Sequence, residues 1–560
     1  MALSASFDKS AVSAAELLRG FDYAQFRDEL SNVRVAIAFD EEAASAFEGR
    51  TTLELLVNLT ARLYGDVAIE MINGTGPGVS SFARRLAGLA TEINPAIATT
   101  IVDLQGTASG ASDREARVVV GATPVVHRAP VVFVGSDRWE FATSTVAPVG
   151  SGASSNPFGA AAAACIGAAC LFRMIFARQL AHQSEEVETD ARNDTTACSV
   201  VQLEDPPMRV SLLSMSHVQV GGWQSPSLDG QPVNIDETCL VGVGAIGNAS
   251  AWVLGKTPGV TGLLHLIDHE QVDESNLQRY VLTSAADVGL RKVDLFSKHS
   301  ARTEAPPSQA LTIRTHAKTW AEFISTRGSY VIPRALLALD SAEDRIAVQG
   351  SLPQWVANAW TQPANAGVSR HPRFDANPCI VCLYMPDGRT KGKDQLYAEA
   401  VGAQGPVELM QIRELLHSGR SVGAEFLQRT AQRLGVPVEP LAAFAARPLA
   451  DFYHDALCGG IVLRLSNGKT ATRVEAPLAF QSAFAGVLLA AELVLDALGA
   501  RPSHFPTRTE VDLLHAVAPS LNVPAAKSAT GRCICEDAAF VRAYLGKYGS
   551  GTRVHGVAGE

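Results

Sequence analysis

The sequence predicts an α/β protein made of two similar halves, each built on a parallel sheet. Short apolar segments alternate with helical patterns between residues 33 and 134, and the alternation returns between residues 236 and 340. Alternating strands and helices are typical of a parallel sheet that helices cover on both faces. With 560 residues, the chain is long enough for roughly two to four domains.

Composition narrows the classes of function. The chain is 47% hydrophobic and 19% charged, which is an ordinary globular balance. A net charge of -10 and the lack of a basic stripe argue against a nucleic-acid partner. The first residues lack the basic start and apolar core of a signal peptide, and nine cysteines do not form a disulfide framework in a chain of this size. We therefore expect a cytoplasmic protein.

The first half is predicted to hold alternating elements but no phosphate-binding turn. Strands are expected at residues 33–39, 66–70, 117–121 and 131–134, and helices at residues 12–32, 51–64 and 82–89. Gly74, Gly76 and Gly78 follow the second strand, but their spacing and the intervening Pro77 favour a loop. This pattern indicates a fold half that has no phosphate to bind.

An alanine-rich segment and a polar stretch follow the first half. Residues 158–172 are the most apolar segment, but Arg173 and Arg178 interrupt it short of the ~20 residues that cross a bilayer. We therefore expect a buried helix and no membrane partner. Residues 179–235 are polar and irregular, and they are predicted to link the two halves.

The second half opens with an apolar strand and a glycine-rich turn. Gly242, Gly244 and Gly247 follow this strand and open a helix, which lets the backbone approach a phosphate at a helix N-terminus. The next strand ends in Asp268, which is placed to bond a ribose hydroxyl group. These two features fit NAD, FAD or ATP equally.

The residues after Asp268 distinguish among these nucleotides. Ser275, Asn276 and Arg279 follow on a loop, Lys292 comes thirteen residues after Arg279, and Asp340 ends a later strand. Nucleotidyl transfer requires cations that face a triphosphate, such as Arg279 and Lys292, and a carboxylate that can hold Mg²⁺, such as Asp340. Hydride transfer needs no such set, so an NAD-dependent oxidoreductase is disfavoured. The alternative interpretation makes Arg279 and Lys292 solvated surface charges.

The remaining elements predict a sheet with an insertion. Strands are expected at 310–314, 335–340 and 460–465, and helices at 287–302, 320–326 and from 476 to about 498, while residues 386–455 form a charged helical insertion. A weak internal echo between residues 131–175 and 459–498 favours two related halves packed as a pseudo-dimer. Chance similarity between two α/β halves is the alternative.

These motifs resemble the adenylation core of the E1 superfamily, which includes ubiquitin-activating enzymes and the bacterial ThiF and MoeB adenylyltransferases. The resemblance covers about residues 236–385 and 476–500 and lies in Gly242-x-Gly244-x-x-Gly247, Asp268, Asp273 to Arg279, Arg291-Lys292 and Leu339 to Arg345. There are two departures from the family pattern. Glu270 stands for the usual second acid, and Ser341 stands for the asparagine that often follows the catalytic aspartate.

The resemblance implies two Rossmann-like adenylation halves with parallel sheets in a pseudo-dimer, a mainly helical cysteine-bearing insertion and a zinc site. It implies an inactive half at 1–205, an ATP-binding domain at 206–385, a helical insertion with the catalytic cysteine at 386–460, and completion of the active domain at 461–560. The layout is similar to the E1-like proteins of bacterial ubiquitin-like conjugation operons linked to antiphage defence.

The resemblance also implies the reaction. The C-terminal carboxylate of a ubiquitin-like protein attacks the α-phosphate of MgATP and gives an acyl-adenylate and pyrophosphate. Asp268 would hold the ribose, Arg279 and Lys292 the phosphates and Asp340 the Mg²⁺. The other implied nucleotide-binding residues are Gly242, Gly244, Ala245, Gly247, Ser275, Asn276 and Ser341. A further arginine would come from the other half, with Arg19 and Arg27 as candidates.

Two close cysteine pairs are predicted to form a metal site. Cys379 and Cys382 make one pair, and Cys533 and Cys535 make the other. Four thiolates form a tetrahedral structural Zn²⁺ site, and E1-like bacterial enzymes often carry one. The second pair is one residue shorter than is usual. The alternatives are a redox pair or unrelated buried cysteines.

Cys458 is the candidate nucleophile. It lies between the helical insertion and the final strand, where related enzymes carry the cysteine that displaces AMP to form a thioester. The alternative is a small apolar residue at the start of a strand. Cys165, Cys170, Cys198 and Cys239 are expected to be core or incidental residues.

The expected partners are a ubiquitin-like protein and an E2-like carrier. The nearest alternative is an adenylyltransferase that serves a sulfur carrier and needs no thioester. The long first half and the insertion argue against it, because such enzymes are usually compact homodimers. A non-catalytic scaffold would be expected to lack the set of Arg279, Lys292 and Asp340.

Overall fold

The computed structural model describes residues 30–549, apart from 31, 75, 105–115, 126–128, 185–201, 204, 219–225, 227, 231, 301–310, 363–364, 386–392, 454–455, 457–476, 503–504 and 519–520. The chain divides into two compact units. The body comprises Arg34–Ile175, Val200–Met385 and Ala479–Glu560, and the other unit contains Pro386–Leu478 together with Met1–Val33 and Phe176–Ser199.

The first sheet of the body has eight strands in the order β3-β2-β1-β4-β5-β6-β7-β8. The first five strands in this order run parallel, and β6, β7 and β8 continue the sheet antiparallel. The strands are β1 (Arg34–Phe39), β2 (Asp66–Ile72), β3 (Ala98–Leu104), β4 (Ala116–Val120), β5 (Val131–Asp137), β6 (Glu140–Ser144), β7 (Met208–Ser211) and β8 (Ser216–His217).

The second sheet repeats this topology strand for strand. Its order is β11-β10-β9-β12-β13-β14-β15-β16, again with the first five strands parallel and the last three antiparallel. The prediction of two related halves in a pseudo-dimer is therefore confirmed. The strands are β9 (Val233–Val241), β10 (Val260–Ile267), β11 (Leu311–His316), β12 (Arg334–Leu337), β13 (Trp355–Thr361), β14 (Asn365–His371), β15 (Arg508–Asp512) and β16 (Asn522–Val523).

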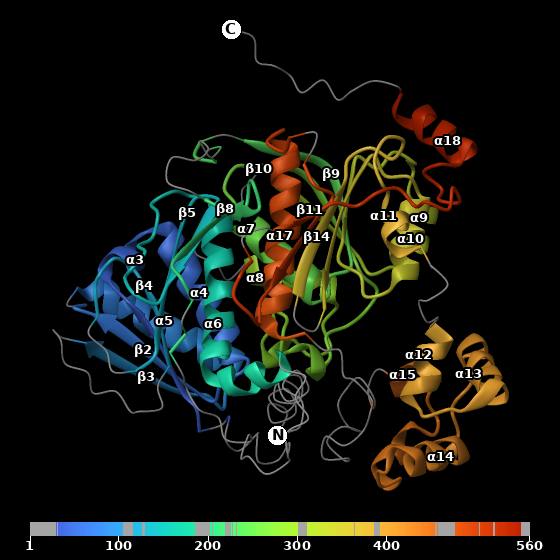
Figure 1. The fold of residues 1–560 in the computed structure, drawn as a ribbon, viewed down its shortest axis with the longest axis horizontal. Helices are drawn as coiled ribbons and strands as arrows, with labels where there is room; N and C mark the ends of the chain where they lie inside the picture. Colours follow the sequence, from blue (N-terminus) through green and yellow to red (C-terminus); the bar gives the residue numbers. More distant parts are fainter. Residues whose placement is uncertain are drawn as a thin grey trace. The chain divides into compact units, whose positions relative to one another are not determined.

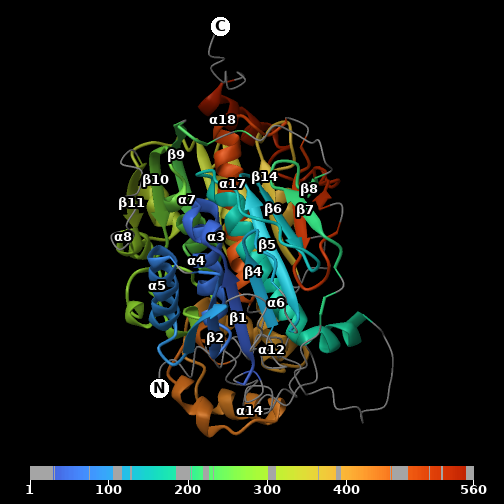
Figure 2. The ribbon, with the colours of Figure 1, turned by 90° about the vertical axis from the view of Figure 1, so that its left-hand side faces the viewer.

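A double layer of helices lies between the two sheets (Figure 1). The first half contributes α4 (Phe47–Ala61) and α6 (Pro157–Ser184), and the second half contributes α7 (Ala245–Lys256) and α17 (Ala479–Ala497). The rings of Phe172 and Phe480 pack with centroids 5.8 Å apart, so α6 and α17 lie side by side, as Figure 2 also shows. Lys256 Nζ lies 2.6 Å from Glu54 Oε2 and joins α7 to α4.

Both long apolar helices are core helices of the fold. By length and composition α6 and α17 pass as membrane spans, but 89% and 94% of their apolar windows are buried within the protein. The prediction of a buried alanine-rich helix is therefore confirmed.

The outer face of the second sheet is covered by four further helices. Residues from the sheet and the helices share one apolar core. These helices are α9 (Trp320–Thr326), α10 (Ala342–Gly350), α11 (Ile380–Tyr384) and α18 (Ala538–Tyr548). In the first half, α3 (Glu41–Ser45) and α5 (Pro77–Ile93) complete the described helices.

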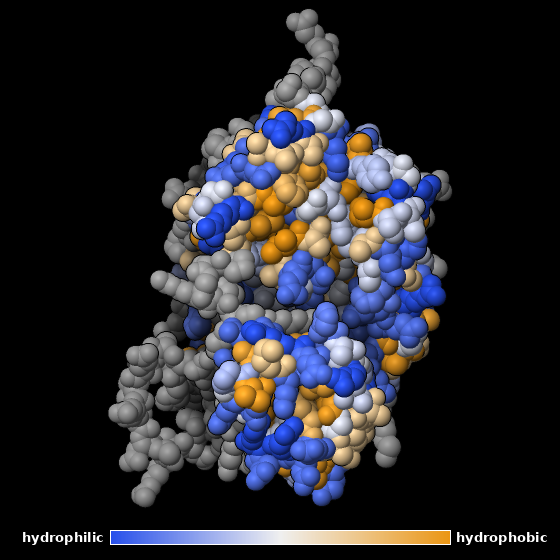
Figure 3. Space-filling model, turned by 90° about the vertical axis from the view of Figure 1, so that its right-hand side faces the viewer, coloured by the Kyte–Doolittle hydropathy of each residue, from blue (hydrophilic) through white to orange (hydrophobic). Residues whose placement is uncertain are grey.

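The helical insertion has its own core. Tyr397, Leu427, Leu441 and Phe452 are buried together, and the ring of Tyr397 stacks on that of Tyr453 with centroids 3.9 Å apart. Figure 3 shows apolar side chains among polar ones on the surface of this unit. Its helices are α12 (Lys393–Ala400), α13 (Gly405–Ser418), α14 (Ala424–Leu434) and α15 (Leu449–Phe452).

Several predicted elements differ from the structure. Part of the predicted linker is ordered, because α6 runs to Ser184 and β7 and β8 complete the first sheet beyond the expected boundary at residue 205. Helix α5 begins at Pro77, within the predicted glycine loop, since proline suits the first turn of a helix. The predicted helix at 287–302 is a short 3-10 turn, η3 (Lys292–Asp294), followed by α8 (Leu295–Ser300). The predicted strand at 460–465 lies outside the described residues, as does nearly all of the helix at 12–32.

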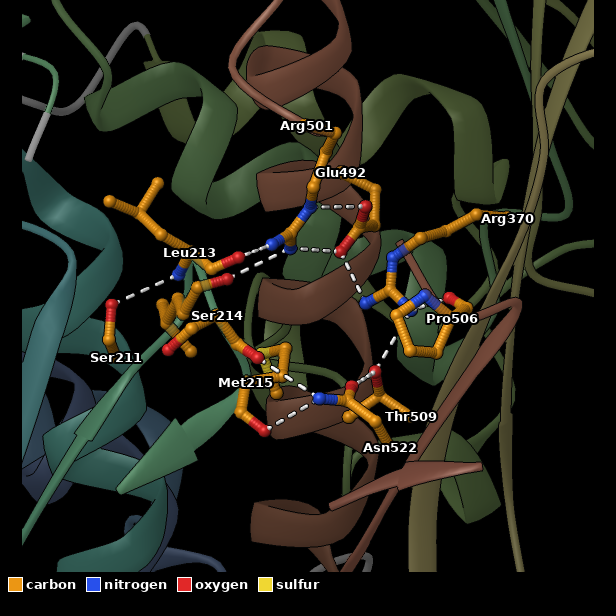
Figure 4. A network of polar contacts seen from close by, with 11 residues as sticks. Ser211, Leu213, Ser214, Met215, Arg370, Glu492, Arg501, Pro506, Thr509 and Asn522 are labelled. Atoms are coloured by element: carbon orange, nitrogen blue, oxygen red, sulfur yellow. Dashed lines mark hydrogen bonds and ion pairs between the residues drawn. The ribbon is translucent and has the colours of Figure 1, made fainter. Parts of the chain in front are cut away.

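A buried polar network joins the antiparallel ends of the two halves (Figure 4). Glu492, on α17, lies between the guanidinium groups of Arg370 and Arg501, at 2.6 and 2.5 Å. Arg501 also donates to the backbone oxygens of Leu212 and Leu213, which lie in the turn between β7 and β8. Asn522 donates to the next two carbonyl groups of this turn, Ser214 and Met215, so one half holds a turn of the other.

The charge of Glu492 stabilises the folded state at neutral pH. Burial acts against its carboxylate form, but Arg370 and Arg501 outweigh burial and lower the pKa of Glu492 to about 2. A carboxyl group whose pKa is lowered by folding stabilises the protein fully above its ordinary pKa. This contribution is then lost as the pH falls from about 4.5 toward 2.

Replacing Glu492 with glutamine leaves two buried guanidinium groups without a carboxylate between them. We expect Glu492→Gln to lower the free energy of unfolding at pH 7 by about 3–5 kcal/mol, because it breaks a buried ion pair. Denaturant titration measures this loss. The matched control is Glu510→Gln, on β15, because Glu510 is partly exposed and its Oε1 lies 3.5 Å from Arg508 Nη1. Its loss should stay below about 1 kcal/mol, and equal losses in both variants would contradict the assigned role.

Candidate functional site

The carboxyl ends of four neighbouring strands form the edge on which the predicted site residues lie. Backbone hydrogen bonds continue beyond the strands: Asp268 N donates to His316 O at 3.1 Å, Gly242 N to Ile267 O at 2.9 Å and Ala338 N to Val241 O at 2.9 Å. The ends of β11, β10, β9 and β12 are therefore tied in order. The glycine-rich turn lies between the strand end that carries Asp268 and the segment that carries Asp340.

Close packing of the turn requires glycine at two positions. Gly242 has a φ of 88°, and a Cβ atom at this residue would lie 2.5 Å from Ala338 O. A Cβ atom at Gly247 would lie 2.1 Å from Gly242 O. Helix α7 then begins at Ala245 with Gly244 as its N-cap and no side-chain capping bond, so its first amide groups are available to an anion.

Asp268 fastens the turn to the second strand. Its Oδ2 accepts a hydrogen bond from Val243 N at 2.8 Å, and its Oδ1 accepts one from Glu270 N at 2.9 Å. The carboxylate therefore lies beside the glycine-rich turn, which is the position that the sequence predicts for a group that binds ribose.

Lys292 is buried and forms an ion pair with Glu270. Its ammonium group contacts the carboxylate of Glu270 and lies 5.3 Å from the ring centroid of Tyr280. Burial acts against the charged form, but Tyr280, Glu270 and Asp268 raise the pKa of Lys292 above its usual value. The lysine is therefore charged and close to Asp268, with Glu270 as its partner in this structure.

Ser275 and Asn276 form a short 3-10 turn, η1 (Glu274–Asn276), that presents Arg279. Asp273 accepts a hydrogen bond from Ser275 N at 2.7 Å, and Asn276 Oδ1 accepts one from Asp273 N at 3.0 Å. This reciprocal capping fixes the start of the loop. The side chain of Arg279 is half-buried and makes no hydrogen bond or ion pair with the part of the chain that the structure describes.

Asp340 follows β12 and is exposed. Within the described residues its carboxylate is in no hydrogen bond or ion pair, so it is available to a cation. Ser341 caps α10, because its Oγ accepts a hydrogen bond from Asp344 N at 3.0 Å. Arg345 donates to the backbone oxygens of Leu339 and Ser341 and so holds the segment that presents Asp340.

The first half fills the equivalent position with its own carboxylate. Asp40 follows β1 as Gly242 follows β9, and its Oδ1 accepts a hydrogen bond from Ala43 N in α3 at 2.9 Å. Its Oδ2 accepts from Ala122 N at 2.8 Å and from Thr123 N at 2.9 Å, beyond the end of β4. The backbone N of Asn73 donates to Leu104 O at 3.0 Å, just as Asp268 N donates to His316 O, so Asn73 occupies the position that Asp268 has in the second half.

Sequence reasoning missed an arginine that connects the halves at this site. Arg19 and Arg27 lie outside the described residues, but Arg62, the C-cap residue of α4, reaches the loop after Asn276 and bonds its backbone. Its partners in this loop, Leu277 and Thr283, are more than 200 positions away, so no local pattern identifies it.

The four cysteines of the predicted metal site come together. Their Sγ atoms all lie within 4.8 Å of one another, and Cys533 Sγ lies 3.4 Å from Cys379 Sγ and 3.3 Å from Cys382 Sγ. A tetrahedral metal with bonds of about 2.3 Å separates its sulfur ligands by about 3.8 Å. Hydrogen bonding from Cys379 lowers the pKa of Cys382, and the four thiols fit one metal ion.

The other cysteines differ in environment. Cys165 and Cys170 lie buried in α6, where burial raises the pKa of Cys170 to about 11. Burial likewise raises the pKa of Cys239 to about 12. Both environments disfavour a thiolate, and the burial of all three cysteines agrees with the prediction that they are core residues. Cys198 and the candidate nucleophile Cys458 lie outside the described residues.

Comparisons with known proteins place these features in a family. The sequence model of the ThiF family matches residues 235–530, and the model described as Prokaryotic E2 family C matches residues 38–177. The uncharacterised protein y4jF of Sinorhizobium fredii is 42% identical over 551 residues, which is 98% of each chain.

Solved structures resemble the fold more distantly. The structure of E. coli MccB with ATP is 13% identical, with a TM-score of 0.33, over 54% of this chain and 67% of that one. A structure of PaaA is 18% identical, with a TM-score of 0.27, over 50% of this chain and 69% of that one.

The thiol cluster predicts one bound metal ion per chain. Cys533→Ser should lose most of this metal, because it removes one of four thiolate ligands. Elemental analysis of the purified protein measures the change. Cys170→Ser is the matched control, since it makes the same change at a buried thiol outside the cluster and should retain one equivalent. Unchanged metal content in Cys533→Ser would exclude this site.

Proposed function

The chain belongs to the ThiF family of adenylating enzymes, and we propose that it activates the C-terminal carboxylate of a ubiquitin-like protein with MgATP. The adenylate is then passed to Cys458 as a thioester and handed to an E2-like carrier. One observation carries the adenylation proposal: Asp268, the glycine-rich turn and the Asp340 segment lie on adjacent strand ends, and the side chain of Arg279 makes no hydrogen bond or ion pair with the described residues. The proposed reaction is cytoplasmic and involves neither nucleic acid nor a membrane.

The first step is nucleotidyl transfer. A carboxylate oxygen attacks the α-phosphorus of ATP, an acyl-phosphate bond forms, and the bond to pyrophosphate breaks. Asp268 accepts hydrogen bonds from the ribose, and the free amide groups of α7 and Asn276 face the phosphates. Arg279 and Lys292 compensate the charge that develops on the leaving pyrophosphate.

Magnesium fits the carboxylate at Asp340. An exposed carboxylate with no described partner, next to a triphosphate site, matches the preference of Mg²⁺ for one or two carboxylates together with phosphate oxygens. When bound, the ion supplies charge neutralisation at the phosphates. Arg345 and Ser341 keep this segment in place by bonding its backbone and capping α10.

We propose that the first half binds no nucleotide. The Asp40 carboxylate occupies the amide groups that an anion would need, and Asn73 replaces the acid that bonds ribose. The match to an E2 family does not make this half a thioester carrier. Its matched range contains only the cysteines Cys165 and Cys170, and both are buried.

The thioester step uses a thiolate on the long connection between β14 and α17. The Cys458 sulfur attacks the acyl carbon of the adenylate, the carbon–sulfur bond forms, and AMP leaves. An E2-like carrier then accepts the acyl group by exchange between thiols. The placement of Cys458 after a separately packed helical unit supports this step.

We propose that the cluster of four thiols holds zinc. Four-thiolate tetrahedral sites are typical of structural Zn²⁺ and leave no open position for catalysis. Cys379 and Cys382 begin the long connection, and Cys533 and Cys535 follow the last strand, so the ion fastens the connection to the C-terminal segment.

Binding of MgATP should show one site per chain. Isothermal titration of the purified protein measures the stoichiometry and the dissociation constant. Arg279→Ala should weaken binding about tenfold or more, because it removes charge-assisted bonds to phosphate. Arg508→Ala, at a partly exposed arginine of β15, is the control and should bind as the parent does. Two sites per chain, or no binding, would contradict the proposed assignment of the halves.

The thioester proposal predicts separate effects on the two steps. With MgATP and a ubiquitin-like protein, Cys458→Ala should keep ATP–pyrophosphate exchange but lose the adduct seen on non-reducing gels. Asp340→Asn should reduce exchange about 100-fold. Cys170→Ala is the control and should keep the adduct.

Other outcomes of this experiment separate the remaining alternatives. Exchange without an adduct in the parent protein would favour a sulfur-carrier adenylyltransferase. An adduct that persists in Cys458→Ala would assign the thioester to another cysteine. Absence of exchange with every ubiquitin-like protein tested would contradict the proposed substrate class.

A further inference from the structure

We propose that Arg62, on the first half, is a positioning residue of the nucleotide site, and that it acts by holding the loop of the second half that carries Arg279. The inference rests on the proposed function, because it assigns Arg279 to the phosphates of ATP. It adds a residue that lies outside the motifs of the second half and belongs to the half that we propose binds no nucleotide.

Arg62 fastens both ends of one loop. It lies buried at the C-terminal end of α4, and its Nη1 donates to Leu277 O. Its Nη2 donates to Thr283 O at 2.8 Å. These two carbonyl groups flank the segment that contains Arg279 and Tyr280, so one guanidinium group sets the distance across the loop.

A neighbouring residue of α4 orients this guanidinium group and holds the middle of the loop. Arg62 Nε donates to Asn58 Oδ1 at 2.9 Å, and Asn58 Nδ2 donates to Val281 O at 2.9 Å. The first half therefore bonds three backbone carbonyl groups of the loop, at Leu277, Val281 and Thr283.

The second half holds the same loop from its own side. Asn248, on α7, accepts a hydrogen bond from Leu282 N at 2.7 Å. Tyr280 O accepts one from Thr283 Oγ1 at 2.7 Å, which closes the turn. The loop is thus clamped between α4 and α7, the two helices that follow the first strand of each sheet.

The clamped segment carries the groups that face the proposed phosphates. Tyr280 packs against Lys292, and its hydroxyl group lies 3.5 Å from the position a Cβ atom would take on Gly244. The tyrosine is thus beside the glycine-rich turn. The side chain of Arg279, its neighbour, makes no hydrogen bond or ion pair with the described residues, so the loop backbone determines where its guanidinium group can reach.

The chemistry of Arg62 favours a positioning role over a general stabilising one. Burial lowers the pKa of Arg62 to about 9, although the charge of Asp287 opposes this effect. A buried guanidinium group gains little net stability, because loss of water offsets much of its bonding. The specific effect of Arg62 is geometric, because its planar guanidinium group holds the carbonyl groups of Leu277 and Thr283 at a fixed separation.

The decisive experiment compares nucleotides. We expect Arg62→Met to raise the dissociation constant of MgATP about tenfold, because bonds from a charged donor to the loop are lost. The constant for AMP should stay within about twofold, since Asp268 lies on a strand end that Arg62 does not touch. Arg62→Lys, which keeps the charge but not the planar fork, should give an intermediate value.

A matched control separates positioning from loosening of the two halves. Lys256→Met removes another contact between the halves, the Lys256–Glu54 ion pair of α7 and α4, without touching the loop. It should leave MgATP binding unchanged. If it weakens MgATP binding as much as Arg62→Met does, the effect is general and the proposal is wrong.

A double-mutant cycle shows whether Arg62 acts through Arg279. The Arg62→Met/Arg279→Ala protein should bind MgATP no more weakly than Arg279→Ala alone, because coupled residues are not additive. Hydrogen exchange of the amides at residues 277–283 should be faster in Arg62→Met at an unchanged melting temperature. Additive losses, or unchanged exchange in this loop, would overturn the proposal.

The parent protein distinguishes failure of the inference from failure of the proposed function. If it does not bind MgATP, the proposed function is wrong. If it binds MgATP and Arg62→Met binds equally well, the proposed function stands and the positioning role is wrong.

Discussion

The contacts that α4 makes with the second half are the constraint on which the nucleotide site depends. The Lys256–Glu54 ion pair joins α7 to α4, and Asn58 and Arg62 bond the loop after β10. Because α4 ends beside the loop after β10, residues of the first half come to hold the loop that carries Arg279. The apolar pair α6 and α17 extends this layer, and the network around Glu492 fastens its far end. Two sheets with the same topology thus make one asymmetric site.

The asymmetry comes from a few side chains on a common framework. After the first strand, Asp40 accepts hydrogen bonds from the start of α3 and from the segment after β4, whereas the start of α7 in the other half has no side-chain cap. After the second strand, Asn73 replaces Asp268. The backbone N of each residue donates to the last residue of the neighbouring strand, which is Leu104 in β3 and His316 in β11. A carboxylate at Asp40 repels a phosphate, whereas a glycine turn with free amide groups attracts one. The two halves share one fold, and we therefore propose that charge at the strand ends determines which half accepts a nucleotide.

The fold could be predicted largely from local pattern, and the site only in part. Alternating strands, the glycine spacing and the cysteine pairs are short-range signals, and the structure confirms the two α/β halves and brings the four thiols together. The predicted linker failed because β7 and β8 are very short and gain stability from pairing with β6, which no local pattern shows. The partner of Lys292 is Glu270, and the clamp on the loop comes from Arg62, through contacts that depend on tertiary packing. Such long-range partners lie beyond what spacing along a single chain can indicate.

The connection between the first antiparallel strand and the apolar helix differs between the two halves, although its place in the topology is the same. In the first half, residues 145–156 join β6 to α6, and Glu48 holds them at the sheet by accepting hydrogen bonds from Ser154 N and Oγ at 3.2 and 2.6 Å. In the second half, residues 372–478 occupy the same place in the order of elements. There the cysteine cluster fixes the start of the connection and α17 fixes its end, while a helical unit with its own core lies between them. A thiol on this connection need not lie on a strand of the sheet, because the cysteine cluster and α17 hold the two ends of the connection without it. In the proposed function, the thiol that takes the acyl group belongs to this long connection, so the strand ends that carry Asp268 and Asp340 need no change to accommodate it.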